Sequence, residues 1–263
     1  MPIGAAENAV INDRSAAGIG SLLERKQMGY PAHKRHLIHI MEWYPDLLGG
    51  KILDLGSGTG KFLTQIAEVG GDAIGIEPSQ RHIDASRELA RSLNVSVEVQ
   101  KGKGESLPFS DETFGFVNMA EIIEHVDNPE RVLGEVFRVL KTGGGAYMSV
   151  PNRLGLYDPH YHTYAVNWLP RSMAPLFLKL SGKEKQYAHE SDDIGAQRLE
   201  AMHYYTFSGI QHLCRQIGFT VIDIRDHKIR SMDLSNIRCA IYVAAYKIAR
   251  IFYFNTFHVG LVK

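Results

Sequence analysis

The chain has 263 residues, of which 44% are hydrophobic and 22% charged, and its 29 lysines and arginines balance 29 aspartates and glutamates. This composition is typical of a globular protein and excludes a disordered chain. The charge balance disfavours a nucleic-acid partner, because such partners are attracted by a basic surface. Two cysteines, Cys214 and Cys239, are too few for a disulfide framework or a zinc cluster.

The start of the chain lacks the basic region and apolar core of a signal peptide, so we expect a cytoplasmic protein. The most apolar stretch, residues 240–254, is too short to cross a bilayer and contains Lys247 and Arg250. We therefore expect no transmembrane segment. The sequence gives no signal for the oligomeric state.

Residues 1–50 are expected to be a helical lead-in, with a helix over residues 29–50. From residue 51 the pattern alternates between strands and helices. Strands are predicted at 51–55, 72–77, 95–102, 114–120 and 144–150, and helices at 61–70, 79–93 and 129–141. Ser79 is a good N-cap for the second of these helices. Such alternation predicts βαβ crossovers and a parallel sheet.

The alternation stops after the fifth strand. Residues 151–202 are rich in aromatic residues, histidine and proline, with one expected helix at 169–180. A structureless segment of this length is unusual in a compact domain, so we expect an inserted lid that recognises the acceptor. A helix (206–218), a strand (219–226), a helix (234–250) and a strand (257–263) follow.

The predicted fold is α/β, with a doubly wound, mostly parallel seven-stranded sheet and a lid after strand five. The expected parts are an N-terminal lead-in (1–50), a cofactor-binding half (51–152), the lid (153–202) and a C-terminal part that completes the sheet (203–263).

Three glycines, Gly56, Gly58 and Gly60, stand directly behind the first strand in "ILDLGSGTGKF" (52–62). In a doubly wound sheet, ligands bind beyond the carboxyl ends of the strands, where the next helix offers free N–H groups. The alternative is that the glycines only permit a tight turn. Their number and spacing, after the acidic Asp54, favour a ligand.

The spacing of these glycines argues against a dinucleotide. Lys61 stands where a G-x-G-x-x-G fingerprint needs its third glycine, and the loop lacks the Lys-Ser/Thr of a phosphate-binding loop. Glu77, at the end of the second strand, can accept hydrogen bonds from ribose hydroxyls. The loop therefore suits a nucleoside with an unphosphorylated, zwitterionic extension, a description that S-adenosylmethionine fits.

With these motifs, the chain resembles the class I S-adenosylmethionine-dependent methyltransferases over about residues 50–152. The resemblance rests on "ILDLGSGTG" (52–60), "IGIEPS" (74–79), "GKGESLPF" (102–109), the segment 121–144 and "SVPN" (149–152). It is greatest to the ubiquinone-biosynthesis type and to small-molecule and glycan-precursor methyltransferases.

The resemblance implies a cofactor site and an assignment for Asp54, which would hold the methionine amino group. The implied cofactor-binding residues are Asp54, Gly56, Ser57, Gly58, Gly60, Glu77, Pro78, Gly104, Glu105, Ser106 and Ala120. The chain departs from the family at Lys103, where an acidic residue is usual, and at Phe114–Gly115, where Phe-Asp is common.

The motif "EIIEH" follows the fourth strand. If it begins a helix, Glu121, Glu124 and His125 share one face and form half of a site for a hard cation. Some relatives hold a metal with this pattern and a histidine after strand five, here His160 or His162, whereas others hold none. We favour the metal-free alternative, with no metal ligands assigned and with His125 and Glu121 as the catalytic residues.

The acceptor is expected to contact Asn152, His160, His162 and His203. The aromatic residues near 161–168 suit either a planar or sugar acceptor or a small core of the insertion itself. The predicted function is O-methylation of a small molecule or a glycan or lipid precursor, with S-adenosylmethionine as cofactor. Two alternatives stay open: a metal-assisted RNA 2′-O-methyltransferase and a non-catalytic cofactor-binding partner.

Overall fold

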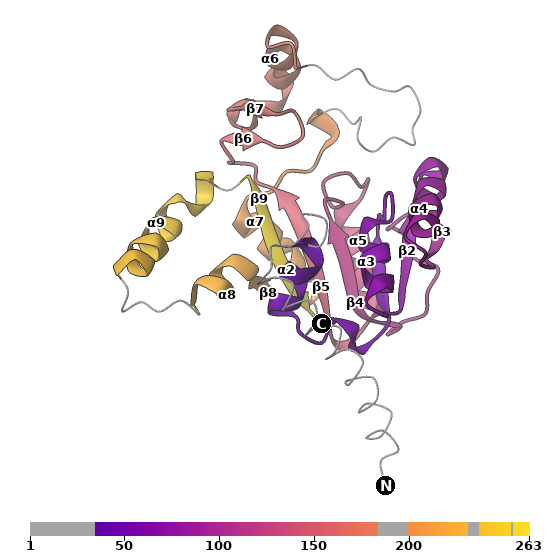
Figure 1. Cartoon of the computed structure of the whole chain (residues 1–263). Helices are drawn as coiled ribbons and strands as arrows, with labels where there is room; N and C mark the ends of the chain where they lie inside the picture. The colour runs from indigo at the N-terminus through magenta and orange to yellow at the C-terminus, as the bar shows by residue number, and fades with distance from the viewer. Residues whose placement is uncertain (1–34, 184–198, 231–236, 254) are drawn as a thin grey trace. The chain divides into compact units, whose positions relative to one another are not determined.

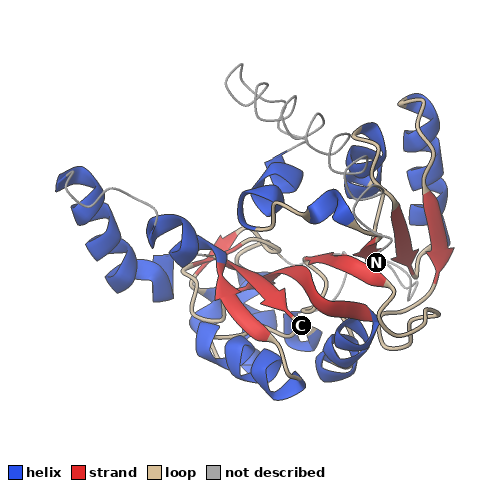
Figure 2. Cartoon of the chain, turned by 90° about the horizontal axis from the view of Figure 1, so that it is seen from below, coloured by secondary structure: helices blue, strands red, loops and turns tan. Residues whose placement is uncertain are grey.

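The computed structural model describes residues 35–183, 199–230, 237–253 and 255–263 (Figure 1). Seven strands form one sheet in the order β3-β2-β1-β4-β5-β9-β8. The order reverses between β1 and β4, which is the crevice where ligands bind in doubly wound sheets. The neighbouring strands are the red arrows of Figure 2. The expected seven-stranded α/β fold is confirmed.

The chain divides into two compact units, which are described separately. The first comprises Met1–Asn118, Arg138–Ala146 and Lys263, and the second comprises Met119–Phe137 and Tyr147–Val262. Two strands, β4 (Phe114–Ala120) and β5 (Leu140–Pro151), have residues in both units.

The first unit follows the predicted alternation closely. Its elements are α2 (Arg35–Trp43), a 3₁₀ turn (Leu47–Gly49), β1 (Ile52–Leu55), α3 (Lys61–Glu68), β2 (Ala73–Glu77), α4 (Gln80–Ser92) and β3 (Glu98–Lys101). β1 pairs in parallel with β2 and β4, and β2 with β3. All four residues of β1 are buried, which is typical of a central parallel strand covered on both faces.

The start of one helix in this unit and the end of another are explained by single residues at their boundaries. Ser79 is the N-cap of α4, and its hydroxyl accepts a hydrogen bond from the His82 N–H, as the sequence predicted. The helix expected over 29–50 lies partly outside the described residues. Its described part, α2, ends at Trp43, two residues before Pro45, because the residue before a proline disfavours the helical conformation.

The second unit contains most of α5 (Pro129–Val139), whose residues up to Phe137 belong to it, and most of the chain after β5. It contains a hairpin of β6 (Tyr157–Asp158) and β7 (Thr163–Tyr164), then 3₁₀ turns at Val166–Trp168 and Arg171–Met173, and α6 (Ala174–Leu180). A 3₁₀ turn (Leu199–Ala201), α7 (Phe207–Ile217), β8 (Thr220–Asp223), α8 (Ile224–Arg230), α9 (Ile237–Tyr253) and β9 (Thr256–Val262) follow. β8 and β9 are antiparallel.

One prediction for this unit needs correction, and one element was not predicted. The strand expected over 219–226 ends at Asp223, where its Oδ1 accepts the N–H groups of Arg225 and Asp226 and starts α8. The hairpin β6–β7 was not predicted, because its strands have only two residues each. Among the described residues, no helix has the length and apolar character needed to cross a membrane.

Candidate functional site

The glycine loop after β1 takes a backbone path that suits glycine at all three positions. Gly56, Gly58 and Gly60 have φ angles of 66°, 50° and 75°, in the left-handed region that costs other residues energy. A Cβ at Gly60 would collide with the Ser86 side chain, whereas a Cβ at Gly58 would meet nothing within 4 Å. Gly60 is thus required by helix packing, and the space beside Gly58 is open to a ligand.

Glu77, at the end of β2, connects the glycine loop after β1 to the loop after β2 through hydrogen bonds. Its buried carboxylate accepts hydrogen bonds from the Gly58 N–H (2.8 Å) and the Ser79 N–H (3.0 Å). The His82 Nδ1 lies 3.3 Å from the same carboxylate. A carboxylate has about four acceptor positions, so the two N–H bonds and the imidazole contact fix its orientation without exhausting its capacity. Glu77 is therefore held in place for a further donor such as a hydroxyl.

Asp54, in β1, is the second buried carboxylate of this unit. Burial raises its pKa to about 7, the hydrogen bond from Asn118 opposes that shift, and the charge of Glu77 adds to it. The Asn118 Nδ2 donates to Asp54 Oδ1 at 2.7 Å, and the Asn118 Oδ1 lies 2.9 Å from His36 Nε2. A buried carboxylate with no cation among these contacts is suited to pair with an ammonium group.

The remaining predicted cofactor residues lie in the same unit, except Ala120. The Ser57 hydroxyl is buried without a hydrogen-bond partner. Gly104 is buried, Glu105 half-buried and Ser106 exposed, all in one turn. Pro78 and Ala120 are half-buried. An open glycine cradle, an orphaned hydroxyl and two oriented carboxylates fit a nucleoside that carries an amino group, and this is the chemistry of S-adenosylmethionine.

The segment after β4 is a turn, so the helix considered for residues 121–125 is wrong. Helix α5 begins only at Pro129, a residue favoured at the first helical position. Its start is fixed by Asn128, whose Oδ1 accepts the Arg131 N–H at 2.9 Å. Glu121 is exposed with φ 57°, and its N–H donates to Ser149 Oγ.

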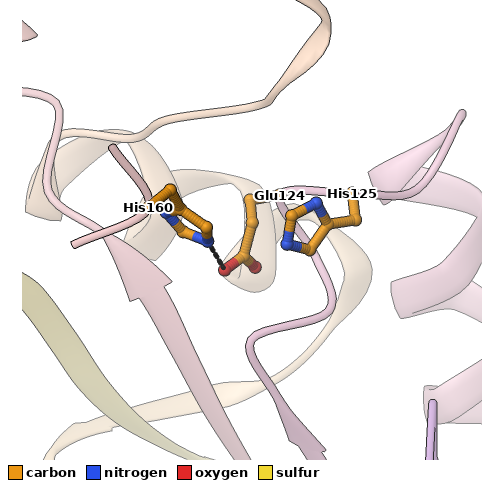
Figure 3. Close-up of side chains that lie close together, drawn as sticks. All are labelled: Glu124, His125 and His160. Atoms are coloured by element: carbon orange, nitrogen blue, oxygen red, sulfur yellow. Dashed lines mark ion pairs between the residues drawn. The ribbon is translucent and has the colours of Figure 1, made fainter. Parts of the chain in front are cut away.

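Three side chains of the second unit, Glu124, His125 and His160, nevertheless converge (Figure 3). Glu124 is fully buried, and neither of its carboxyl oxygens has a hydrogen-bond partner. The His160 Nε2 lies 3.7 Å from Glu124 Oε1. The rings of His125 and His160 are 5.3 Å apart and nearly perpendicular. The cluster thus contains Glu124 and His125 but not Glu121, which the sequence analysis had named as catalytic together with His125.

Burial raises the pKa of Glu124 to about 8, and the negative charge of Glu121 adds to this shift. The carboxyl group is therefore largely protonated at neutral pH. One donor atom from each of Glu124, His125 and His160 lies within 4.8 Å of the others. Such a cluster can hold either a shared proton or a cation.

A hydrogen-bonded chain fixes the orientation of His160. Asp158 is buried, and its Oδ1 accepts the backbone N–H groups of His160 and Tyr161. The Tyr204 hydroxyl donates to Asp158 Oδ2 at 2.8 Å and lies 3.0 Å from His160 Nδ1. Because the hydroxyl has given its single proton to Asp158, Nδ1 of His160 must donate to it. In the neutral ring, Nε2 then carries a lone pair, and it faces Glu124.

Other expected acceptor residues have different positions. His203 donates its backbone N–H to the Glu124 carbonyl at 2.9 Å and so braces the cluster. His162 is exposed, and its Nδ1 lies 3.0 Å from the Tyr157 hydroxyl. Asn152 is buried, and its Oδ1 accepts the Leu154 N–H in a turn. Of the two histidines proposed after strand five, His160 is the one that joins the cluster.

The aromatic residues of the insertion divide between the two expected roles. Tyr161 is buried in a small hydrophobic core of Tyr161, Val166, Ala174, Leu178, Leu199 and Met202. Tyr164 and Trp168 are exposed. Part of this aromatic content therefore stabilises the insertion itself.

Sequence reasoning missed His36, Asn118, Asp158 and Tyr204. Asn118 carried one usable signal, because a polar residue inside an apolar strand needs a partner when it is buried. His36 is half-buried in α2, and its contact with Asn118 joins residues 82 positions apart in the chain. The hydrogen bond between Asp158 and Tyr204 joins residues 46 positions apart in the chain, so no local sequence pattern indicates it.

The chain is similar in sequence to known methyltransferases. Residues 53–148 match the family model described as "Methyltransferase domain". A ubiquinone biosynthesis O-methyltransferase of Rhizobium etli is 30% identical over 131 residues, which are 48% of this chain and 52% of the relative. The chain thus spans about half the length of that relative.

Two further similarities cover more of the chain. A ubiquinone biosynthesis O-methyltransferase of Coxiella burnetii is 23% identical over 209 residues, or 75% of this chain and 89% of the relative. The crystal structure of an S-adenosylmethionine-dependent methyltransferase of Mesorhizobium loti superposes with a TM-score of 0.53 at 15% identity, covering 88% of this chain and 98% of the other. This structural likeness supports the fold.

Proposed function

We propose that this chain, whose residues 53–148 match the methyltransferase-domain model, is a class I S-adenosylmethionine-dependent methyltransferase that methylates a hydroxyl oxygen of a small-molecule acceptor. S-adenosylmethionine supplies an electrophilic methyl group on a sulfonium centre. The first unit binds this donor, and the second unit binds the acceptor and takes its proton.

In the first unit, two carboxylates bind different parts of the methyl donor. Asp54 pairs with the amino group of the methionine part, because it is buried and no cation is among its contacts described above. Glu77 accepts hydrogen bonds from the ribose hydroxyls, for which the Gly58 and Ser79 N–H groups orient it. The bare backbone at Gly58 admits close approach of the ligand.

The observation that carries the proposal for the second unit is the buried carboxyl of Glu124, which has no hydrogen-bond partner and lies beside two imidazoles. An acceptor hydroxyl must lose its proton when its oxygen is methylated. At neutral pH Glu124 holds a proton, so a neutral imidazole is the group able to accept one. His125 takes the proton that the acceptor oxygen loses, while that oxygen gains the methyl group and the sulfonium becomes a neutral thioether.

The choice of oxygen as the methylated atom is supported by the names of the curated relatives, which are ubiquinone biosynthesis O-methyltransferases. It is also supported by the cluster itself, because an oxygen nucleophile gains more from a neighbouring base than an amine that is already neutral. A small molecule or a glycan or lipid precursor remains the proposed class of acceptor.

A metal-assisted reaction is the second candidate, favoured by the convergence of three donor atoms on one point. A divalent cation held by Glu124, His125 and His160 would lower the pKa of the acceptor hydroxyl. The tautomer of His160, with its Nε2 lone pair facing Glu124, suits a metal ligand as well as a proton acceptor.

The experiment that separates these candidates is activity measured on metal-analysed protein with and without chelator. The metal-free proposal predicts that chelator leaves turnover unchanged and that His125→Ala removes most of it. The matched control is His162→Ala, an exposed histidine outside the cluster, which should retain activity. Stoichiometric bound metal together with chelator-sensitive turnover would establish the metal-assisted reaction instead.

The same samples test the two other functions. RNA binding that weakens steeply with salt would favour an RNA acceptor. Tight binding of S-adenosylmethionine without transfer to any acceptor would favour a non-catalytic partner.

A further inference from the structure

Three side chains of the first unit, His36 of α2, Asn118 of β4 and Asp54 of β1, form a hydrogen-bonded triad. The Asn118 Nδ2 donates to Asp54 Oδ1 at 2.7 Å, and the Asn118 Oδ1 lies 2.9 Å from the His36 Nε2. Asp54 and Asn118 are buried, and His36 is half-buried. Polar groups shielded from water in this way are matched donor to acceptor within the protein.

The amide of Asn118 determines the direction of both hydrogen bonds. A carbonyl oxygen only accepts, so the ring nitrogen that faces Asn118 Oδ1 must donate. His36 therefore carries a proton on Nε2. Burial lowers the pKa of the His36 imidazole, although the hydrogen bond with Asn118 opposes that shift. The ring is thus neutral at pH 7, with its single proton on the nitrogen that faces Asn118.

The same three positions allow one other arrangement of protons. If the Asn118 amide turned over, its oxygen would face Asp54 and its NH₂ group would face His36. Asp54 would then have to be protonated, and His36 would have to accept through Nε2. Burial raises the pKa of Asp54 to about 7, so its protonated form is accessible at neutral pH. An ammonium group needs Asp54 ionised, which only the observed arrangement allows.

We propose that His36 is a positioning residue for the cofactor: by donating from Nε2, it holds the Asn118 amide in the orientation that stabilises Asp54 as a carboxylate. The proposal rests on the assignment of Asp54 to the amino group of S-adenosylmethionine. His36 needs no contact with the cofactor for this role. Because the amide then donates to a charged oxygen, its hydrogen bond is stronger than one between neutral groups.

The test compares two ligands that differ in the group assigned to Asp54. Methylthioadenosine has the adenosine part of S-adenosylmethionine and no amino group. His36→Phe removes the donor and keeps an aromatic ring beside Phe62, whose centroid lies 5.5 Å from that of His36. In calorimetric titrations, this variant should bind S-adenosylmethionine about tenfold more weakly and methylthioadenosine as wild type does. His36→Gln restores a donor and should bind S-adenosylmethionine within about threefold of wild type.

Two further variants show whether the effect passes through the triad. His39→Phe is the matched control, because it changes another half-buried histidine of α2 that lies outside the triad. It should bind both ligands as wild type does. Asn118→Leu removes both hydrogen bonds of the triad, so adding His36→Phe to it should weaken S-adenosylmethionine binding no further.

Three results would overturn the proposal. One is a His36→Phe protein that binds both ligands equally weakly, because the ring then has only a structural role. Another is wild-type binding of S-adenosylmethionine by His36→Phe. The third is a neutral His36 ring protonated on Nδ1 in the ¹⁵N NMR spectrum of the S-adenosylmethionine complex, because Nε2 then cannot donate.

Asp54→Asn separates failure of this proposal from failure of the proposed function. If Asp54→Asn binds both ligands as wild type does, the assignment of Asp54 is wrong, and the role of His36 is wrong with it. If Asp54→Asn loses affinity for S-adenosylmethionine alone while His36→Phe binds as wild type does, the assignment of Asp54 stands and only the role of His36 is wrong.

Discussion

Replacing Asp54 with asparagine should stabilise the unliganded protein at alkaline pH while weakening its binding of S-adenosylmethionine. The pKa of Asp54 is about 7 in the folded chain against 3.8 as the reference value. The folded state therefore binds more protons between pH 4 and 7, so stability contributed by this group is lost as pH rises through that window. At about 1.4 kcal/mol per pH unit, the loss approaches roughly 4 kcal/mol above pH 7.

Asp54→Asn lacks this penalty and keeps an oxygen to accept the hydrogen bond from Asn118. Urea unfolding at pH 5 and pH 8 should show a variant that gains stability relative to wild type as pH rises. Asp72→Asn, which changes an exposed carboxylate, is the matched control and should show no such trend. Calorimetric titration should show S-adenosylmethionine binding weakened by about 10- to 100-fold, because a charge-assisted hydrogen bond is lost. An Asp54→Asn protein that is equally destabilised at both pH values would refute the reasoning.

Two further predictions concern the glycine loop and the Tyr204 hydroxyl. Gly60→Ala should cost about 2 kcal/mol or more in unfolding free energy, because it adds a clash to a strained φ. Gly58→Ala should cost only about 1 kcal/mol yet abolish the thermal shift given by S-adenosylmethionine; equal stability losses in the two variants would count against the open cradle. Tyr204→Phe should lower kcat about tenfold and alter its pH profile with KM little changed, because His160 loses the group that fixes its tautomer. Tyr164→Phe, which changes an exposed tyrosine, is the control and should keep the pH profile of the wild type. Identical pH profiles for the wild type, Tyr204→Phe and Tyr164→Phe would contradict the role given to Tyr204.

Most of the sheet could be predicted from the sequence, because its signals are local. Short apolar runs, a glycine turn and the Ser79 cap each specify an element within a few residues, and β1, β2 and β4 lie within one residue of the predicted bounds. The prediction failed where a side chain redirects the backbone. At Asp223, one carboxylate oxygen accepts two N–H groups and ends a strand that the apolar pattern would have continued.

The candidate site was predictable only in part, for a related reason. The motif "EIIEH" pointed to Glu124 and His125, but its spacing was interpreted on the assumption that residues 121–125 form a helix. Asn128 and Pro129 instead start the helix only after the motif. The contacts of Asn118 with Asp54 and His36, and that of Tyr204 with Asp158, depend on tertiary packing. Residues brought together from distant parts of a chain leave no periodic or spacing signal in it.

The most direct test of the central claim is transfer of a labelled methyl group from S-adenosylmethionine to the components of a small-molecule extract. The position of the label is then determined by mass spectrometry and NMR. We expect one labelled product that carries the methyl group on oxygen, lost with His125→Ala and retained with His162→Ala. A methyl group found on nitrogen, carbon or RNA, or equal transfer by the two variants, would contradict it.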